Sequence, residues 1–271
     1  NSYNRYNFTA RNTTHFLNDK LTLDIGAQYI VQNNKNMVSQ GQYYNPLPSL
    51  YLFPRGDNFD EIRLYERYNT NYGYMEQYWP YGDASLSLQN PYWIQNRINR
   101  TSNKKRYMMN ASLKWQAADW LNVVGRVNLD NSDYRNKNEK SASTLTTFCG
   151  VSGGFEDAMR QERSLYADFL ANIDKTFGDF HLTANVGASI YHTSMDQLYI
   201  AGDLVIPNFF QINNINFSAN YKPDPTGYED EIQSIFASAE LSWKNQLYLT
   251  VTGRNDWDSK LAFSKQKSFF Y

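Results

Sequence analysis

The sequence predicts an all-β fold, namely a segment of an antiparallel transmembrane β-barrel of which about eight strands are visible. Three observations predict it. Apolar and polar residues alternate along eight segments, which is the pattern of strands with two different faces. Short turns alternate with long connections, and aromatic residues flank the short turns. Both of these features are typical of outer-membrane barrels.

The strands are expected in four hairpins. In the first, apolar residues alternate from Tyr6 to Phe16 and again from Leu21 to Val31, around a turn at 18–20. The same pattern recurs in three further hairpins, at 107–129, 165–190 and 235–253. We expect each strand to run for about 10 residues, which is the length that a tilted strand needs to cross a bilayer. Strands of soluble sheets are usually shorter, roughly 5–6 residues.

The connections between hairpins are expected to be long extracellular loops, at 32–104, 131–162 and 192–231. The short turns at the other end carry an aromatic girdle, which marks a membrane interface. Its members are Phe16, Trp115, Trp120, Phe177, Phe180, Trp243 and Tyr248.

The two faces of the strands differ in charge. The apolar face carries almost none, and the opposite face carries Arg126, Asn128, Asp168, Asn172, Asp174, Glu240 and Arg254. Because an Arg or Lys facing lipid at mid-depth costs about 2–4 kcal/mol, the charged face is expected to line a wet lumen or contact a plug. Alternation alone would also fit a soluble sheet with its apolar face buried. Strand length and loop asymmetry favour the barrel.

The composition argues against some classes of protein. The 26 Lys and Arg residues balance 27 Asp and Glu residues, which argues against a general nucleic-acid binder. No run approaches the roughly 20 apolar residues of a membrane helix. The start of the sequence lacks the features of a signal peptide, and both ends read as interrupted strands, so we expect a piece from the middle of a longer protein. The inner face is too polar for a small closed barrel, and open strand edges are costly in lipid, which also favours missing neighbours.

One motif resembles a known family. The stretch 247–259, LYLTVTGRNDWDS, resembles the strand and loop entry of SusC/RagA-type TonB-dependent transporters, and Ser268–Tyr271 resembles the stretch that follows it there. The opening residues 2–7 and the hairpin at 115–133 also fit this family. The resemblance implies a 22-stranded barrel with an N-terminal plug, of which 1–271 is one partial barrel domain. It also implies a SusD-like surface lipoprotein as partner, a TonB complex that acts through an N-terminal region absent from this sequence, and glycan or peptide cargo.

The first long loop is rich in aromatic rings, which can stack on sugars or pack against peptides. Trp79, Tyr81 and Trp93 are the candidates for contact with substrate or lid. The alternative is that the rings form a small core of the loop itself.

No catalytic or cofactor motif is found, so we expect no enzyme. Acidic residues cluster at 57–61 and 224–231, but without the spacing of a calcium loop, so solvated loop charge is favoured and calcium remains the alternative. The three histidines have no metal-site spacing. Cys149 has no partner for a disulfide and no nucleophile motif.

These observations together predict active import of a nutrient across a bacterial outer membrane, with the strands in contact with the lipid bilayer. Two alternatives are a passive or adhesive outer-membrane barrel and a soluble carbohydrate-binding β protein.

Overall fold

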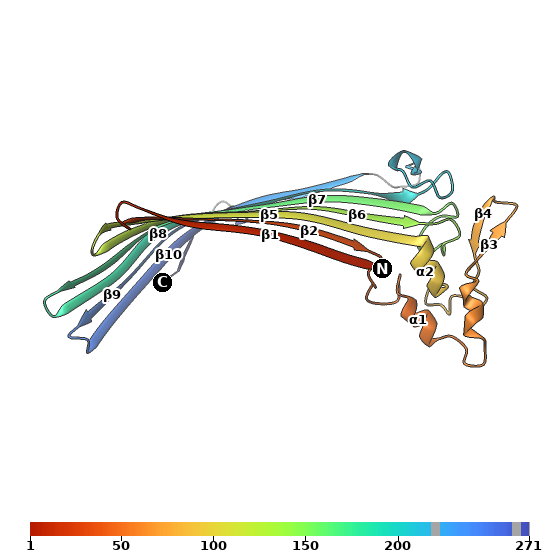
Figure 1. Ribbon diagram of the computed structural model, residues 1–271, viewed down its shortest axis with the longest axis horizontal. Coiled ribbons are helices and arrows are strands. Elements are labelled where there is room, and N and C mark those ends of the chain that lie inside the picture. The colour runs from red at the N-terminus through yellow and green to blue at the C-terminus, as the bar shows by residue number, and fades with distance from the viewer. Residues whose placement is uncertain (218–222, 262–266, 271) are drawn as a thin grey trace.

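The computed structural model describes residues 1–217, 223–261 and 267–270, the last of these by backbone alone. Within these residues one large antiparallel sheet has nine strands in the order β1-β2-β5-β6-β7-β8-β9-β10-β11. Neighbours in the sheet follow one another along the chain, so the sheet is an up-and-down meander with β1 and β11 at its edges (Figure 1). The strands span Ser2–Phe16, Leu21–Lys35, Ile98–Ala118, Leu121–Lys140, Gly154–Phe177, Phe180–Asp203, Asp224–Trp243, Leu247–Asp258 and Lys267–Phe270.

Short turns lie at one end of this sheet and all the helices of the described chain lie at the other (Figure 1). The long connection after β2 contains α1 (Pro46–Tyr51), the 3-10 helix η1 (Phe59–Arg63), α2 (Pro91–Arg97) and a small hairpin of β3 (Glu66–Asn69) and β4 (Tyr74–Gln77). A second 3-10 helix, η2 (Ile212–Asn214), follows β8. Among the described residues no helix is long and apolar enough to cross a membrane. The asymmetry of the two ends is the one predicted from the sequence.

The strands are longer than expected. β7 and β8 have 24 residues each, and even β1 and β2 have 15, against the roughly 10 predicted. The loops are correspondingly shorter, at 36–97, 141–153 and 204–223. The error has a physical cause: beyond the apolar band both faces of each strand meet water, so polar residues occupy both and the alternation disappears while the hydrogen bonding continues.

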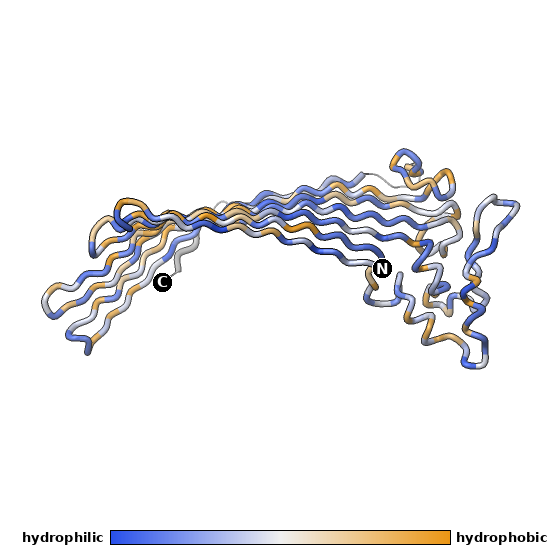
Figure 2. The backbone as a smooth tube through the Cα atoms, viewed as in Figure 1, coloured by the Kyte–Doolittle hydropathy of each residue, from blue (hydrophilic) through white to orange (hydrophobic). Residues whose placement is uncertain are grey.

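Hydrophobic and hydrophilic residues alternate along the strands (Figure 2). Because the paired residues of neighbouring strands share a face, the sheet has an outer face, which carries the alternating apolar residues, and an inner face, which carries the polar ones. Apolar side chains of the outer face do not pack into a core. Val127, Phe169, Val186, Ile235 and Val251 are 42–62% exposed. A soluble sandwich would cover such residues with a second layer. The structure therefore leaves an uncovered apolar surface, as a lipid-facing sheet does.

Aromatic rows border this surface. Trp115 pairs with Leu21 beside the short turns, and Tyr107 pairs with Tyr29 eight residues away along the same strands. Eight residues span roughly 26 Å at about 3.3 Å per residue, or about 20 Å across the membrane for a tilted strand. This height is close to the apolar band of about 25 Å found in outer-membrane barrels.

Candidate functional site

The inner face is a ladder of cross-strand polar pairs. Arg126 on β6 holds Asp168 on β7 with two hydrogen bonds of 2.7 and 2.9 Å, and the Tyr166 hydroxyl donates to the same carboxylate at 2.8 Å. Arg11 and Asp24 form an equivalent pair between β1 and β2 at 3.0 Å, and Arg106 pairs with Asp130 between β5 and β6. Arg126 lies directly opposite Asp168 in the register, whereas the other two pairs are diagonal, two positions apart on neighbouring strands. Both arrangements place the guanidinium within reach of its carboxylate on the same face of the sheet.

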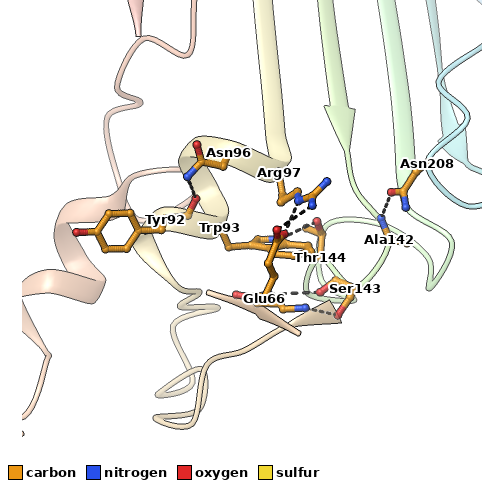
Figure 3. Close-up of polar contacts among 10 residues, drawn as sticks. Glu66, Tyr92, Trp93, Asn96, Arg97, Ala142, Ser143, Thr144 and Asn208 are labelled. Atoms are coloured by element: carbon orange, nitrogen blue, oxygen red, sulfur yellow. Dashed lines mark hydrogen bonds and ion pairs between the residues drawn. The ribbon is translucent and has the colours of Figure 1, made fainter. Parts of the chain in front are cut away.

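Two loops at the helical end form one unit, which we call the loop block (residues 36–97 and 141–153). Trp93 on α2 is completely buried and its indole N–H donates to the Thr144 hydroxyl at 3.1 Å (Figure 3). The Gln77 backbone N–H donates to the Ser143 hydroxyl at 3.0 Å, and the Ser141 N–H donates to the Arg97 carbonyl at 3.0 Å. These bonds join segments that lie far apart in the sequence.

Local signals position the two helices of the loop block. Each begins after an asparagine that caps it, since Asn45 accepts from the Leu47 N–H and Asn90 accepts from the Tyr92 N–H. Proline follows each asparagine at the first helical position, where its missing N–H is not needed. Two Asn-Pro pairs in a loop could have predicted both helix starts, which the sequence analysis did not.

One ion pair and one hydrogen bond from the next connection complete the loop block. Arg97, at the end of α2, binds Glu66 of β3 through two hydrogen bonds of 2.5 and 2.9 Å (Figure 3). Asn208, from the next connection, accepts a hydrogen bond from the Ala142 N–H at 2.8 Å. All three long connections are therefore tied together at one end of the sheet.

The three ring candidates occupy different settings. Trp93 has no exposed surface, so it stabilises the loop block and offers no contact to a ligand in this conformation. Its burial against Ile94 and Ile98 is the small-core alternative weighed from the sequence. Trp79 and Tyr81 are half-buried, contact each other edge to face at 5.0 Å, and form a row that continues to Phe53. A ligand contact at Trp79 or Tyr81 stays a prediction.

A pocket lies on the inner face beneath the loop block. This polar pocket has a volume of about 320 Å³. Its inner-face lining consists of Asn34, Arg100, Ser102, Asn136, Asn138, Glu156, Ala158 and Tyr199, and Met37 of the first loop borders it. The sequence analysis missed it, because these residues lie where the strands are polar on both faces.

Two buried oxygen atoms that line the polar pocket have no hydrogen-bond partner within the described protein. The side-chain oxygens of Asn34 and Asn138 are buried and accept no hydrogen bond from the described protein. The Asn138 side-chain N–H donates to the Glu156 carboxylate at 3.3 Å, so the amide oxygen of Asn138 points away from that carboxylate. Arg100 holds the first loop in place, through the Met37 carbonyl at 2.7 Å and the Ser39 hydroxyl. Burial lowers the pKa of Arg100.

The histidine, acidic and cysteine candidates do not come together as a metal site within the described residues. His192 lies between Glu229 and Glu231 at 3.5 and 3.6 Å, and Asp230 pairs with Lys260 at 3.0 Å. Within the described part of the chain no three His, Cys, Asp or Glu side chains are grouped as metal ligands. Cys149 is buried in the loop block, and burial raises the pKa of its thiol to about 11.

Comparisons with known proteins place the fold. No family model matches the sequence, and no curated protein matches it. Solved structures do match. The RagAB peptide importer in the open-open state aligns with 99% of this chain at a TM-score of 0.72 and 13% identity, over 29% of its own length. The siderophore receptor PiuA from Acinetobacter baumannii aligns with 98% at 0.52 and 10% identity, over 38% of its length.

A third match is the ferripyoverdine receptor of the outer membrane of Pseudomonas aeruginosa, which aligns with 94% of the chain at a TM-score of 0.50 and 14% identity, over 31% of its length. The chain thus spans well under half of each protein. At these identities the likeness concerns the fold. The chain has the fold of part of an outer-membrane transporter barrel, and this agrees with the fold class, the membrane location and the SusC/RagA-type resemblance inferred from the sequence.

Proposed function

We propose that residues 1–271 form part of the barrel wall and the extracellular loops of an outer-membrane importer for a nutrient, either a glycan or a peptide. The proposal assigns binding and transport to the protein, with no catalysis and no cofactor. Its partners are a SusD-like surface lipoprotein and a TonB complex that acts through a plug domain. The polar pocket is the observation that carries the proposal.

The location and chemistry of the polar pocket support cargo binding. It lies on the polar inner face and is bordered by the first long loop, which is at the end of the sheet where we propose that cargo enters. Its two unpartnered amide oxygens accept hydrogen bonds from donors such as sugar hydroxyls or peptide N–H groups. The volume, about 320 Å³, lies at the lower end of the range for small-molecule sites.

The surface of the loop block supports the proposal of a lipoprotein partner. Its exposed side contains large apolar side chains, among them Tyr51 at 84%, Tyr68 at 63% and Leu64 at 53% exposure. Exposed aromatic and aliphatic side chains on the extracellular loops fit a surface that contacts another protein. Trp79 and Tyr81 lie in the same loop, and we propose that they contact the cargo or the lipoprotein.

Uptake by cells tests this function. The full-length protein with Asn138→Leu should lose uptake of its nutrient, whereas Asn128→Leu, on the same face of β6 but outside the pocket, should retain it. Equal uptake by the two variants would overturn the pocket assignment. Uptake that persists unchanged in cells without TonB would favour the passive barrel, and recovery of the protein in the soluble fraction would favour the soluble alternative.

A further inference from the structure

The polar pocket is built from two rows of residues that cross the sheet. Residues that pair in the register of neighbouring strands lie side by side, so each row runs across the strands. The first row consists of Asn34, Ser102, Asn136, Ala158 and Tyr199, one each from β2, β5, β6, β7 and β8. The second row, nearer the long loops, consists of Arg100, Asn138 and Glu156. Ser102 and Ala158 have short side chains, which leaves the hollow between the longer ones.

Arg100 differs from the other half-buried arginines of the described chain, which are Arg97 and Arg106. Arg97 binds the Glu66 carboxylate, and Arg106 binds the Asp130 carboxylate. Arg100 forms no ion pair with the described residues, and the two hydrogen bonds of its guanidinium go to neutral oxygens of the first loop. A partly buried cation without an anion is costly, because no charge partner offsets its lost hydration. Three of the five N–H groups of this guanidinium remain for an anion from outside the chain.

The other charges at the polar pocket do not cancel that of Arg100. Glu156 is the one carboxylate among the lining residues, and the buried ammonium of Lys140 binds it. This carboxylate is therefore already neutralised. Thr101 and Lys137 complete the lining from the alternating positions of β5 and β6, whose side chains belong to the outer face. The lining residues together favour an anionic ligand.

Two hydrogen-bond acceptors flank the Arg100 guanidinium. Asn138 lies directly opposite Arg100 in the register, and Asn34 lies diagonally across from it on the other side. The side-chain oxygens of both asparagines are buried and have no partner among the described residues. A ligand that satisfies all three groups has an anion with hydrogen-bond donors on neighbouring atoms. The carboxylate of a uronic acid has such donors, namely the hydroxyls of its own sugar ring, whereas a peptide carboxyl terminus has one N–H beside it.

We propose that the polar pocket binds an acidic glycan, with the carboxylate of a uronic acid on Arg100 and ring hydroxyls donating to Asn34 and Asn138. The inference rests on the proposed function, because it names the class of nutrient that the same pocket selects. The planar fork of an arginine matches the two oxygens of a carboxylate. At the other end of the first row, Tyr199 lies across the short side chain of Ala158 and supplies a ring of the kind on which sugars stack.

Calorimetry with the purified full-length protein tests the proposal. The probes are trisaccharides of galacturonic acid and of glucuronic acid, each compared with the same trisaccharide after its carboxylates are reduced to hydroxymethyl groups. The wild-type protein should bind at least one acidic trisaccharide about tenfold more tightly than its reduced form, because a hydrogen bond to a charged group is worth at least that factor. The two forms share every ring hydroxyl, so the ratio of their affinities isolates the contribution of the carboxylate.

Variants of Arg100 assign this ratio to its charge. Arg100→Gln should abolish the preference for the acidic form, and Arg100→Lys should keep most of it. Because Arg100 also holds the first loop, a purely structural loss would lower both affinities equally and leave the ratio unchanged. Lys104→Gln is the matched control, since Lys104 is a cation on the same face of β5 that lies over the Tyr134 ring and does not line the pocket. It should change neither affinity.

Three results would overturn the proposal: equal affinity for the acidic and reduced forms, an unchanged ratio in Arg100→Gln, or binding of none of the trisaccharides. A peptide that binds more tightly than its C-terminal amide, while no trisaccharide binds, would replace the glycan with a peptide carboxylate. These results leave the proposed function intact. That function fails instead if cells with Asn138→Leu and with Asn128→Leu take up the nutrient equally.

Discussion

The loop block should lose protection as a unit when Trp93 is removed. The side chain has no exposed surface and bonds Thr144 on the other loop, so Trp93→Ala removes a large buried ring and a hydrogen bond together. Truncation of a buried Trp costs about 3–5 kcal/mol. At 1.4 kcal/mol per factor of ten, amides that depend on this contact should exchange at least about a hundredfold faster.

Hydrogen exchange by mass spectrometry on the full-length protein measures this effect. Peptides covering 141–153 should exchange faster in Trp93→Ala, while peptides from the centre of β6 should not change. Trp79→Ala is the control, because the Trp79 indole donates only within its own loop, to the Gly82 carbonyl at 2.6 Å. Trp93→Phe keeps a ring but loses the indole N–H, and should show a smaller loss, of about 1 kcal/mol. Faster exchange confined to 36–97 would refute the idea of one unit.

Three further predictions concern the sheet and the buried thiol. Val127→Arg, on the outer face, should lower barrel stability by about 2–4 kcal/mol, whereas Asn128→Arg should be tolerated; urea unfolding in lipid vesicles distinguishes them. Gly187→Val should destabilise by about 1–3 kcal/mol, because a Cβ there lies 2.7 Å from the Phe236 ring, and the same unfolding assay measures it. Cys149 should resist maleimide at neutral pH, because burial raises its pKa to about 11. A raised thiol pKa stabilises the fold fully below the unfolded value near 9, and this contribution is lost as pH rises toward 11.

Controls sharpen these predictions. A Cβ at Gly125 meets no atom within 4 Å, so Gly125→Val should cost little, and equal losses at Gly125 and Gly187 would contradict the packing argument. Equal losses for Val127→Arg and Asn128→Arg would contradict the assignment of the two faces. Fast labelling of Cys149 in the folded protein would show that the loop block is open in solution.

The sequence predicted the centre of each strand and missed its ends. Between Tyr107 and Trp115 one face meets lipid and the other water, so the alternation reports the strand directly. On the side of Tyr107 toward the long loops, the strand carries polar residues on both faces, as Lys105 and Arg106 show. The alternation that predicts a strand is therefore absent there. The polar pocket lies in that zone, which is why its residues could not be selected from the sequence.

The loop candidates show the same limit. A tryptophan in a long loop can serve a ligand or a local core, and composition does not separate the two. The burial of Trp93 follows from contacts with Ile98 and Thr144, of which the second lies 51 residues away. Such contacts depend on how two loops pack, whereas the Asn-Pro helix starts at 45–46 and 90–91 are local and readable.

The central claim is that the outer face meets lipid and the inner face meets water, and adjacent residues test it most directly. A spin label at position 127 or 128 of the full-length protein, in a Cys149→Ser background and in native outer membranes, reports its surroundings. We predict that the label at 127 is accessible to lipid-soluble oxygen and the label at 128 to a water-soluble relaxation reagent. A label at 127 that is shielded from both would mean that the apolar face is a packed protein core, and would contradict the membrane barrel.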